Sequence, residues 1–235
     1  AEAPAAEGAV TPLSGLRAII AERMAHSAQT TAAVTLQSMV DATDLVALRE
    51  RLKAALDKEL GFSVGYNDLL AVIVARCLVE CPYMNARLEE EGIRQLPEVN
   101  LGLAVDSERG LLVPVVHSAQ RLRLKELAVR FRDLVARARA GKALPDELRG
   151  GTFTITNLGM VGVDMFTPII NLPECAILGV GRIRPEPAVV DGQVAVRQCM
   201  WLSLTFDHRL VDGAPAAHFL QRLIRYIEAP YLLLA

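Results

Sequence analysis

The chain has 235 residues, 52% of them hydrophobic, and a formal net charge of −2 at pH 7. This length and composition allow one α/β domain with a large buried core. The charge provides no basic field for nucleic acid or an anionic membrane, and no apolar run reaches the ~20 residues of a membrane span. We therefore expect no nucleic-acid and no membrane partner.

The first half of the chain predicts helices and strands in alternation. Residues 1–10 have the Ala/Pro composition of a flexible linker, and because the chain does not begin with Met we expect it to be part of a longer protein, with one domain over 11–235. Apolar spacing and turn residues then predict, in order, a helix from Ser14, a strand over 34–40, a helix over 44–60 ending at Gly61, a helix from Asn67 or Asp68 to about Pro82, a hairpin over 86–96, and strands over 99–105 and 111–116.

The second half is richer in strands. The same signals predict a helix over 124–140, strands over 152–156, 176–181, 188–190 and 194–205, a turn at Asp191-Gly192, and a last helix over 212–227. Mixed strands with interspersed helices predict an α/β two-layer sandwich, in which a mixed β-sheet carries helices packed on one side.

None of the four cysteines, Cys77, Cys81, Cys175 and Cys199, forms a Cys-x-x-Cys pair, and Cys77 and Cys81 share one predicted helix face amid apolar residues. This predicts buried, reduced thiols and a reducing location, the cytoplasm or, in a eukaryote, the mitochondrial matrix. No cluster of His, Cys or Glu completes a four-ligand site, so we expect no metal.

Residues 205–213 carry the clearest chemical signal, with the sequence Thr-Phe-Asp-His-Arg-Leu-Val-Asp-Gly. His208 and Asp212 stand four apart, between a predicted strand and a predicted helix. An imidazole there can act as a general base near neutral pH. The structural alternative is a helix-capping aspartate beside a histidine whose hydrogen bonds are satisfied, and a second alternative is a pair of metal ligands.

Several long segments occur in the order seen in one family. Residues 150–181 contain Thr-Phe-Thr-Ile-Thr-Asn-Leu-Gly and Ile-Ile-Asn-Leu-Pro-Glu-Cys-Ala-Ile-Leu-Gly-Val-Gly, and residues 12–24 and 106–116 add two further motifs. Together with Asp-His-Arg-Leu-Val-Asp-Gly, they closely resemble the catalytic domain of the dihydrolipoamide acyltransferases. These proteins are the E2 cores of 2-oxoacid dehydrogenase complexes, and the resemblance implies a fold like that of chloramphenicol acetyltransferase.

The resemblance implies roles for individual residues. His208 matches the general base, and Thr156 matches the Ser or Thr whose hydroxyl stabilises the oxyanion. Asp212 matches an aspartate that pairs with an arginine near the start of the domain, for which Arg17 and Arg23 are both candidates. The other histidines, His26, His117 and His218, stand outside these motifs, and we expect no catalytic role for them.

The resemblance also implies substrates and partners. Coenzyme A would accept the acyl group, and the lipoyl group would be delivered by a separate domain that is not in this chain. The family forms homotrimers with active sites between subunits, assembles them into cubic or dodecahedral cores, and works with E1 and E3 enzymes. The apolar C-terminal end, residues 231–235, would contribute to those contacts. No motif identifies the residues that contact coenzyme A.

One departure from the family affects the expected substrate. Residues 30–35 read Thr-Thr-Ala-Ala-Val-Thr where many relatives have a Pro-His or similar pair. The remaining motifs resemble the pyruvate- and acetoin-type enzymes, so the expected acyl group is acetyl. The alternatives are a non-catalytic oligomeric scaffold, which would not need His208, and a free-standing acyltransferase that acts on a small alcohol or amine.

Overall fold

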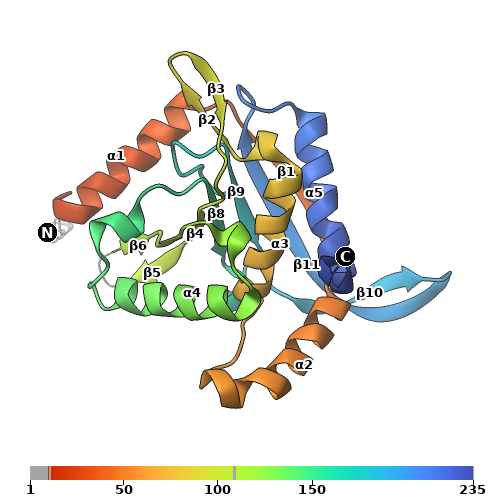
Figure 1. The fold of residues 1–235 in the computed structure, drawn as a ribbon. Coiled ribbons are helices and arrows are strands. Elements are labelled where there is room, and N and C mark those ends of the chain that lie inside the picture. Colours follow the sequence, from red (N-terminus) through yellow and green to blue (C-terminus); the bar gives the residue numbers. More distant parts are fainter. Residues whose placement is uncertain (1–9, 11, 108–109, 235) are drawn as a thin grey trace, which may run out of the picture.

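The centre of the protein is one mixed β-sheet. The structure, a computed structural model, describes residues 10, 12–107 and 110–234. Seven strands form the sheet in the order β1-β11-β9-β8-β4-β7, with β10 paired to β11 (Figure 1). They are β1 Ala33–Asp41, β4 Leu101–Leu103, β7 Val115–Val116, β8 Phe153–Asn157, β9 Ala176–Val180, β10 Arg184–Val190 and β11 Gln193–Asp207. β8 runs parallel to β4 and β9, and the other neighbours are antiparallel.

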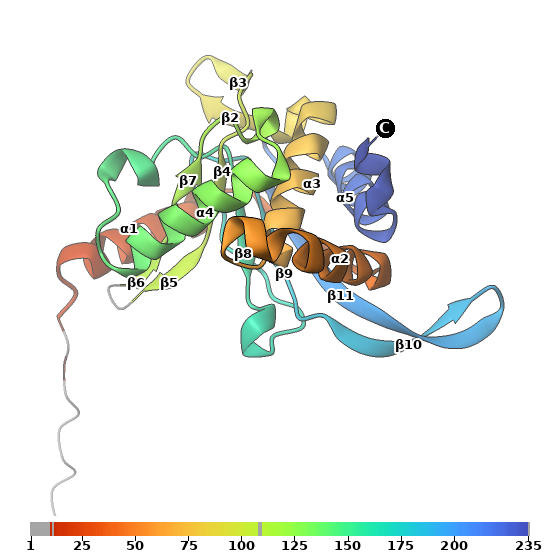
Figure 2. The same ribbon diagram turned by 60° about the horizontal axis from the view of Figure 1, so that its bottom comes forward.

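Four helices pack over one face of this sheet, and a fifth lies at its edge (Figures 1 and 2). The four are α2 Thr43–Leu60, α3 Tyr66–Glu80, α4 Leu124–Arg139 and α5 Gly213–Glu228, and α1 spans Gly15–Thr30. The predicted two-layer arrangement is confirmed, as is the end of α2 at Gly61, whose φ of 71° suits glycine. No helix in the described part of the chain is long and apolar enough to cross a membrane.

The core lies between the helices and the sheet. Helix α5 shows how the sequence builds it, because its buried residues recur at intervals of three and four. Its Phe219 meets Phe153 of β8 with ring centroids 5.7 Å apart. On β8 the side chains of Phe153 and Ile155 point into this core, so Thr154 and Thr156 point to the opposite face.

Two predicted strands are shorter than expected. The strand predicted over 99–105 divides at Ala104 into β4 and β5 Val105–Ser107, and the one over 111–116 divides at Pro114, which has no N–H to donate. β5 pairs with β6 Gly110–Leu112 in a separate two-stranded sheet. The hairpin predicted over 86–96 is confirmed as β2 Ala86–Glu89 and β3 Gly92–Gln95.

The chain ends differ in what the structure shows. The predicted linker over 1–10 lies outside the described residues apart from Val10. Short 3-10 helices, which were not predicted from the sequence, occur between the longer elements and at the C-terminal end. They are Pro82–Met84, Ala119–Arg121, Pro145–Leu148, Gly159–Val161 and Pro230–Leu234. In the last of them Leu232 and Leu233 pack against the core of their own chain, whereas Leu234 is exposed.

Candidate active site

His208 lies on a tight turn between β11 and α5. β11 ends at Asp207 and α5 begins at Gly213. The backbone N–H of His208 donates to the carbonyl of Ala32, 2.9 Å away, which joins the turn to the entry of β1. The imidazole remains 45% exposed and lies 5.9 Å from the Phe206 ring. The fold therefore holds the backbone of His208 and leaves its side chain available to a substrate.

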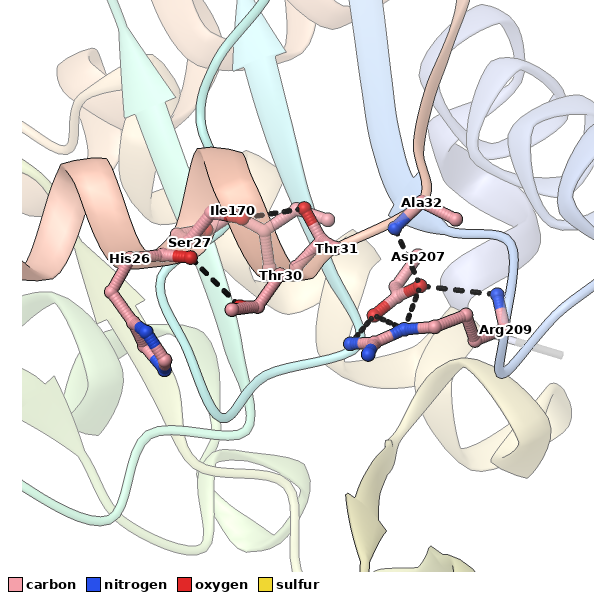
Figure 3. A network of polar contacts seen from close by, with 8 residues as sticks. All are labelled: His26, Ser27, Thr30, Thr31, Ala32, Ile170, Asp207 and Arg209. Carbon is pink, nitrogen blue, oxygen red and sulfur yellow. Dashed lines mark hydrogen bonds and ion pairs between the residues drawn. The ribbon is translucent and has the colours of Figure 1, made fainter.

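Asp207 and Arg209, on either side of His208, form an ion pair (Figure 3). Asp207 is only 2% exposed, and it accepts from the backbone N–H groups of Ala32 and Arg209 and from the Arg209 guanidinium at 2.6–3.2 Å. Burial alone would raise the pKa of Asp207, but these hydrogen bonds, chiefly from Arg209, lower it overall. Sequence reasoning missed both residues, although charges flanking a motif histidine at a strand end were a usable signal.

Asp212 stands beside His208, as the spacing predicted, with Oδ1 3.7 Å from Nδ1 of the imidazole. This distance is too long for a hydrogen bond. Asp212 occupies the N-cap position of α5, but its side chain makes no capping hydrogen bond and is 83% exposed. It can therefore approach His208 by a small change of rotamer.

The predicted pairing of Asp212 with Arg17 or Arg23 is wrong for the single chain. Arg23 instead donates to Oδ1 of Asn171 and to the carbonyl of Leu172, both at 3.2 Å. Within the described residues no hydrogen bond or ion pair joins Arg17 to Asp212. The physical reason is burial, because the exposed Asp212 carboxylate is solvated by water and does not require a fixed cation.

Thr156 lies near the opposite end of the sheet, on β8. It pairs with Gly179 of β9 and is half-buried. The next residue, Asn157, fixes the strand end, because its side chain donates to Oδ1 of Asn67 at 2.7 Å and accepts from the N–H of Gly159 at 2.9 Å. Among the described residues, no hydrogen bond engages the Thr156 hydroxyl, so it is free to donate to a developing oxyanion.

Thr156 and His208 are far apart within one chain. Through Gly179, Thr156 shares a cross-strand row with Ser203 of β11. His208 lies five residues beyond Ser203 and two strands away, a separation of roughly 15–20 Å at about 3.3 Å per residue and 4.8 Å per strand. One chain therefore cannot bring both side chains to the same carbonyl group.

A buried glutamate was also missed. Glu174 is 3% exposed and receives Nδ2 of Asn171 on Oε1 at 2.8 Å, while Oε2 has no partner. Burial raises the pKa of Glu174 to about 8, against the smaller opposing effect of its hydrogen bonds. It lines a cavity of about 470 Å³ beside Arg23 and Arg149. The sequence signal was a lone charge directly before the apolar strand 176–180.

Glu174 should make the free energy of unfolding fall as the pH rises. Because its pKa is raised in the folded state, its contribution is complete below about pH 4.5 and declines by about 1 kcal/mol per pH unit as the pH rises towards 8. We expect Glu174→Gln to flatten the decline of the unfolding free energy between pH 5 and 8. Urea unfolding at fixed protein concentration measures this slope.

Glu80 supplies the control for that experiment. Burial acts to raise the pKa of Glu80, but hydrogen bonds from Arg222, Tyr226 and Arg76 lower it overall. Its contribution is therefore lost as the pH falls below about 4.5, and Glu80→Gln should leave the slope between pH 5 and 8 unchanged. Equal slopes for wild type and Glu174→Gln would mean that Glu174 is ionised in the folded protein.

The side chains of the remaining histidines and of the cysteines take no part in this arrangement. His26 on α1, His117 in the turn after β7 and His218 on α5 are all exposed. All four cysteines are free and buried, as predicted, and burial raises the pKa of Cys175 to about 12. Within residues 12–107 and 110–234, no three His, Cys, Asp or Glu side chains come together as metal ligands would.

Comparison with known proteins gives one consistent group of relatives. The model of the 2-oxoacid dehydrogenases acyltransferase (catalytic domain) family matches residues 5–235. The chain is 39% identical over its whole length to the dihydrolipoyllysine-residue acetyltransferase component of the pyruvate dehydrogenase complex of Bacillus subtilis. It is 41% identical, over 95% of its length, to that of the acetoin cleaving system of the same organism. It spans about half of each relative, 54% and 56% respectively.

Solved structures agree with this result. Dihydrolipoamide acetyltransferase of Azotobacter vinelandii superposes with a TM-score of 0.93 at 35% identity, covering 97% of this chain and 95% of the other. Chloramphenicol acetyltransferase, at 14% identity and a TM-score of 0.52 over 88% and 92% of the chains, shares the fold. The Azotobacter study concerned a serine, a histidine and an asparagine in catalysis, spaced by 52 and four positions, as are Thr156, His208 and Asp212 here.

Proposed function

The chain belongs to the 2-oxoacid dehydrogenase acyltransferase family through its catalytic domain, and on that premise we propose that it transfers an acyl group from S-acyldihydrolipoamide to coenzyme A. The observation that carries the proposal is the half-exposed imidazole of His208 on its fixed turn. The equal spacing of three catalytic candidates in the Azotobacter enzyme supports it.

The reaction needs one base and one oxyanion donor. His208 takes the proton from the thiol of coenzyme A, whose sulfur then attacks the carbonyl carbon of the thioester. The Thr156 hydroxyl donates to the oxygen that becomes negative in the tetrahedral intermediate. The carbon–sulfur bond to dihydrolipoamide breaks, and the protonated His208 returns its proton to the leaving thiolate. No covalent acyl-enzyme is formed.

Asp212 supports the base in this scheme. Its carboxylate lies 3.7 Å from His208 and carries no other ion pair among the described residues. A negative charge at this distance stabilises the imidazolium that forms during the reaction. Because Asp212 is exposed in the single chain, we propose that a second copy of the chain, when it packs over the site, orders the Asp212 side chain.

The acyl group we propose is acetyl. Acetyltransferase components of pyruvate and acetoin systems are 39–41% identical to the chain, and a succinyltransferase component from Bartonella vinsonii is 39% identical. The direct test is transfer from S-acetyl- and S-succinyldihydrolipoamide to coenzyme A. A higher kcat/KM for the acetyl donor supports acetyl as the acyl group, whereas a higher kcat/KM for the succinyl donor would assign succinyl instead. If a well-assembled particle transfers neither group, the proposed function is refuted.

We further propose that the working unit is a homotrimer. The separation of roughly 15–20 Å between Thr156 and His208 within one chain supports a site that takes the two residues from two copies of the chain. One related structure is described as the cubic core of the pyruvate dehydrogenase multienzyme complex, which supports larger assembly here. Lipoyl domains and the E1 and E3 enzymes complete the proposed set of partners.

Mixing inactive subunits should restore activity. Neither His208→Ala nor Thr156→Ala should transfer acyl groups efficiently alone. When both are co-expressed in equal amounts, about one quarter of the sites should join an intact His208 to an intact Thr156, because a cyclic interface combines neighbours at random. The measurement is specific activity of the purified mixture against wild type.

If His208 and Thr156 of each site came from one chain, every site in the mixture would lack one of the two residues, and the specific activity would stay at the level of the single variants. Co-expression of His208→Ala with a second His208→Ala chain carrying a different tag provides the matched control for expression and purification. Recovery in the mixture alone would establish a shared site.

A further inference from the structure

The turn that carries His208 is held on both sides by hydrogen bonds to Asp207, whose side chain is buried. On one side Asp207 donates its N–H to the carbonyl of Cys175 at 3.0 Å and accepts the N–H of Ala32 on its carboxylate at 3.2 Å. On the other side its carboxylate accepts the N–H of Arg209 at 3.0 Å. The segment between α1 and β1, the residue before β9 and the turn itself are therefore all hydrogen-bonded to Asp207, the last residue of β11.

The guanidinium of Arg209 completes this arrangement. It reaches back to the Asp207 carboxylate, two residues earlier in the chain, with Nη2 2.6 Å from Oδ2 and Nε 3.0 Å from both oxygens (Figure 3). Such a forked contact fixes direction as well as distance. With His208 N–H also bound to Ala32, only the side-chain rotamers of the histidine remain free.

The ion pair of Asp207 and Arg209 has no net charge, whereas a single charge at this position would change the protonation of His208. The Asp207 carboxylate is buried one residue before His208, and the Arg209 guanidinium compensates its charge. The other ionisable groups around the turn are few. Asp212 approaches from the start of α5, and Cys175, before β9, has a raised pKa because of burial and the charge of Asp207. The side chain of His26, on α1, points away from Asp207 (Figure 3).

We propose that Asp207 and Arg209 are positioning residues for the acyl transfer: their ion pair fixes the backbone of His208 and shields the imidazole from an uncompensated charge. The inference rests on the proposed function and assigns two residues to the same site. Neither residue needs to touch a substrate. Their effect is transmitted through the backbone and the local field.

The charge part of the proposal predicts shifts of opposite sign. Arg209→Met leaves a buried carboxylate that favours the imidazolium, so the acidic limb of the kcat/KM profile should move to higher pH by about 0.5–1 unit. Asp207→Asn leaves a guanidinium that disfavours it, so the limb should move to lower pH. The double variant Asp207→Asn/Arg209→Met should return to the wild-type profile.

The geometric part predicts a separate loss of kcat. Both single variants loosen the turn, and a displacement of about 1 Å can cost up to 10²-fold, so we expect kcat to fall about 10–100-fold with KM for coenzyme A within about twofold of wild type. Arg209→Lys separates the two effects. It keeps the charge and loses the fork, so its pH profile should match wild type while kcat stays reduced.

A second ion pair on the same strands is the matched control. Arg197 of β11 donates to Asp41, the last residue of β1, at 2.5 Å, and it precedes Asp207 by ten residues along β11. Arg197→Met should lower the free energy of unfolding, measured in urea, by an amount comparable to that of Arg209→Met. It should leave kcat and the pH profile of kcat/KM unaltered. If this control shifted the profile equally, or if Arg209→Met and Asp207→Asn shifted it in the same direction or not at all, the proposal would be overturned.

An independent readout keeps this inference separate from the proposed function. The rate at which diethyl pyrocarbonate modifies His208, followed by peptide mass spectrometry between pH 5 and 8, reports its neutral fraction without any turnover. Opposite shifts in this rate for the two single variants would support the ion pair's role even if wild type transferred no acyl group. Wild-type transfer with unshifted modification rates would refute the positioning role alone.

Discussion

Replacing His208 by alanine is expected to lower kcat by about 10²–10⁴-fold while leaving the fold and the particle size unchanged. The loss follows because the other base on the 207–210 turn, the carboxylate of Asp207, is buried and paired with Arg209, and the pH dependence due to the imidazole should disappear with His208. The fold should survive because the side chain is 45% exposed and makes no hydrogen bond within the described chain. Acetyl transfer to coenzyme A and light scattering on the same sample measure both.

The control for this variant is His218→Ala. His218 is exposed on α5, a little further along the chain, and belongs to no proposed site. It should retain wild-type turnover within about twofold, since surface substitutions seldom matter. A His208→Ala protein with near-normal kcat would refute the assignment of the base, and loss of assembly in that variant would show that His208 is structural.

Replacing Thr156 by alanine is expected to lower kcat by about 10²–10³-fold, which corresponds to the loss of about 2.7–4 kcal/mol of oxyanion stabilisation. The hydroxyl is half-buried at the strand end and unengaged in the described chain, so it is available to the transition state. KM should change little, because the ground-state carbonyl needs this donor less than the oxyanion does. Steady-state kinetics with varied coenzyme A give both constants.

Two substitutions at the same position separate the hydroxyl from the shape of the side chain. Thr156→Ser keeps the donor and should retain most of the turnover. Thr156→Val keeps the shape without the donor and should be as impaired as Thr156→Ala. If Thr156→Val were active, the methyl group rather than the hydroxyl would matter, and another group would have to stabilise the oxyanion.

The sequence predicted the long elements well because their signals are local. The apolar spacing of α5 and the turn glycine after α2 each depend on residues within a few positions of one another. The division of the strands at Ala104 and Pro114 was missed. There the pairing partner decides, since the N–H of Ala104 donates to Ile155 of β8 rather than continuing into β5.

By itself, the sequence determined the long helices and strands, the family resemblance, and the placing of His208 and Asp212 on one turn. The tertiary structure decided which carboxylates are buried. Asp207 is enclosed by Ala32 and Arg209, and Glu174 lies beneath the start of β8, whereas Asp212 stays in solvent without the predicted arginine. It also decided that Thr156 and His208 lie at opposite ends of the sheet. The physical reason is that burial and charge compensation depend on segments distant in sequence, which no local pattern encodes.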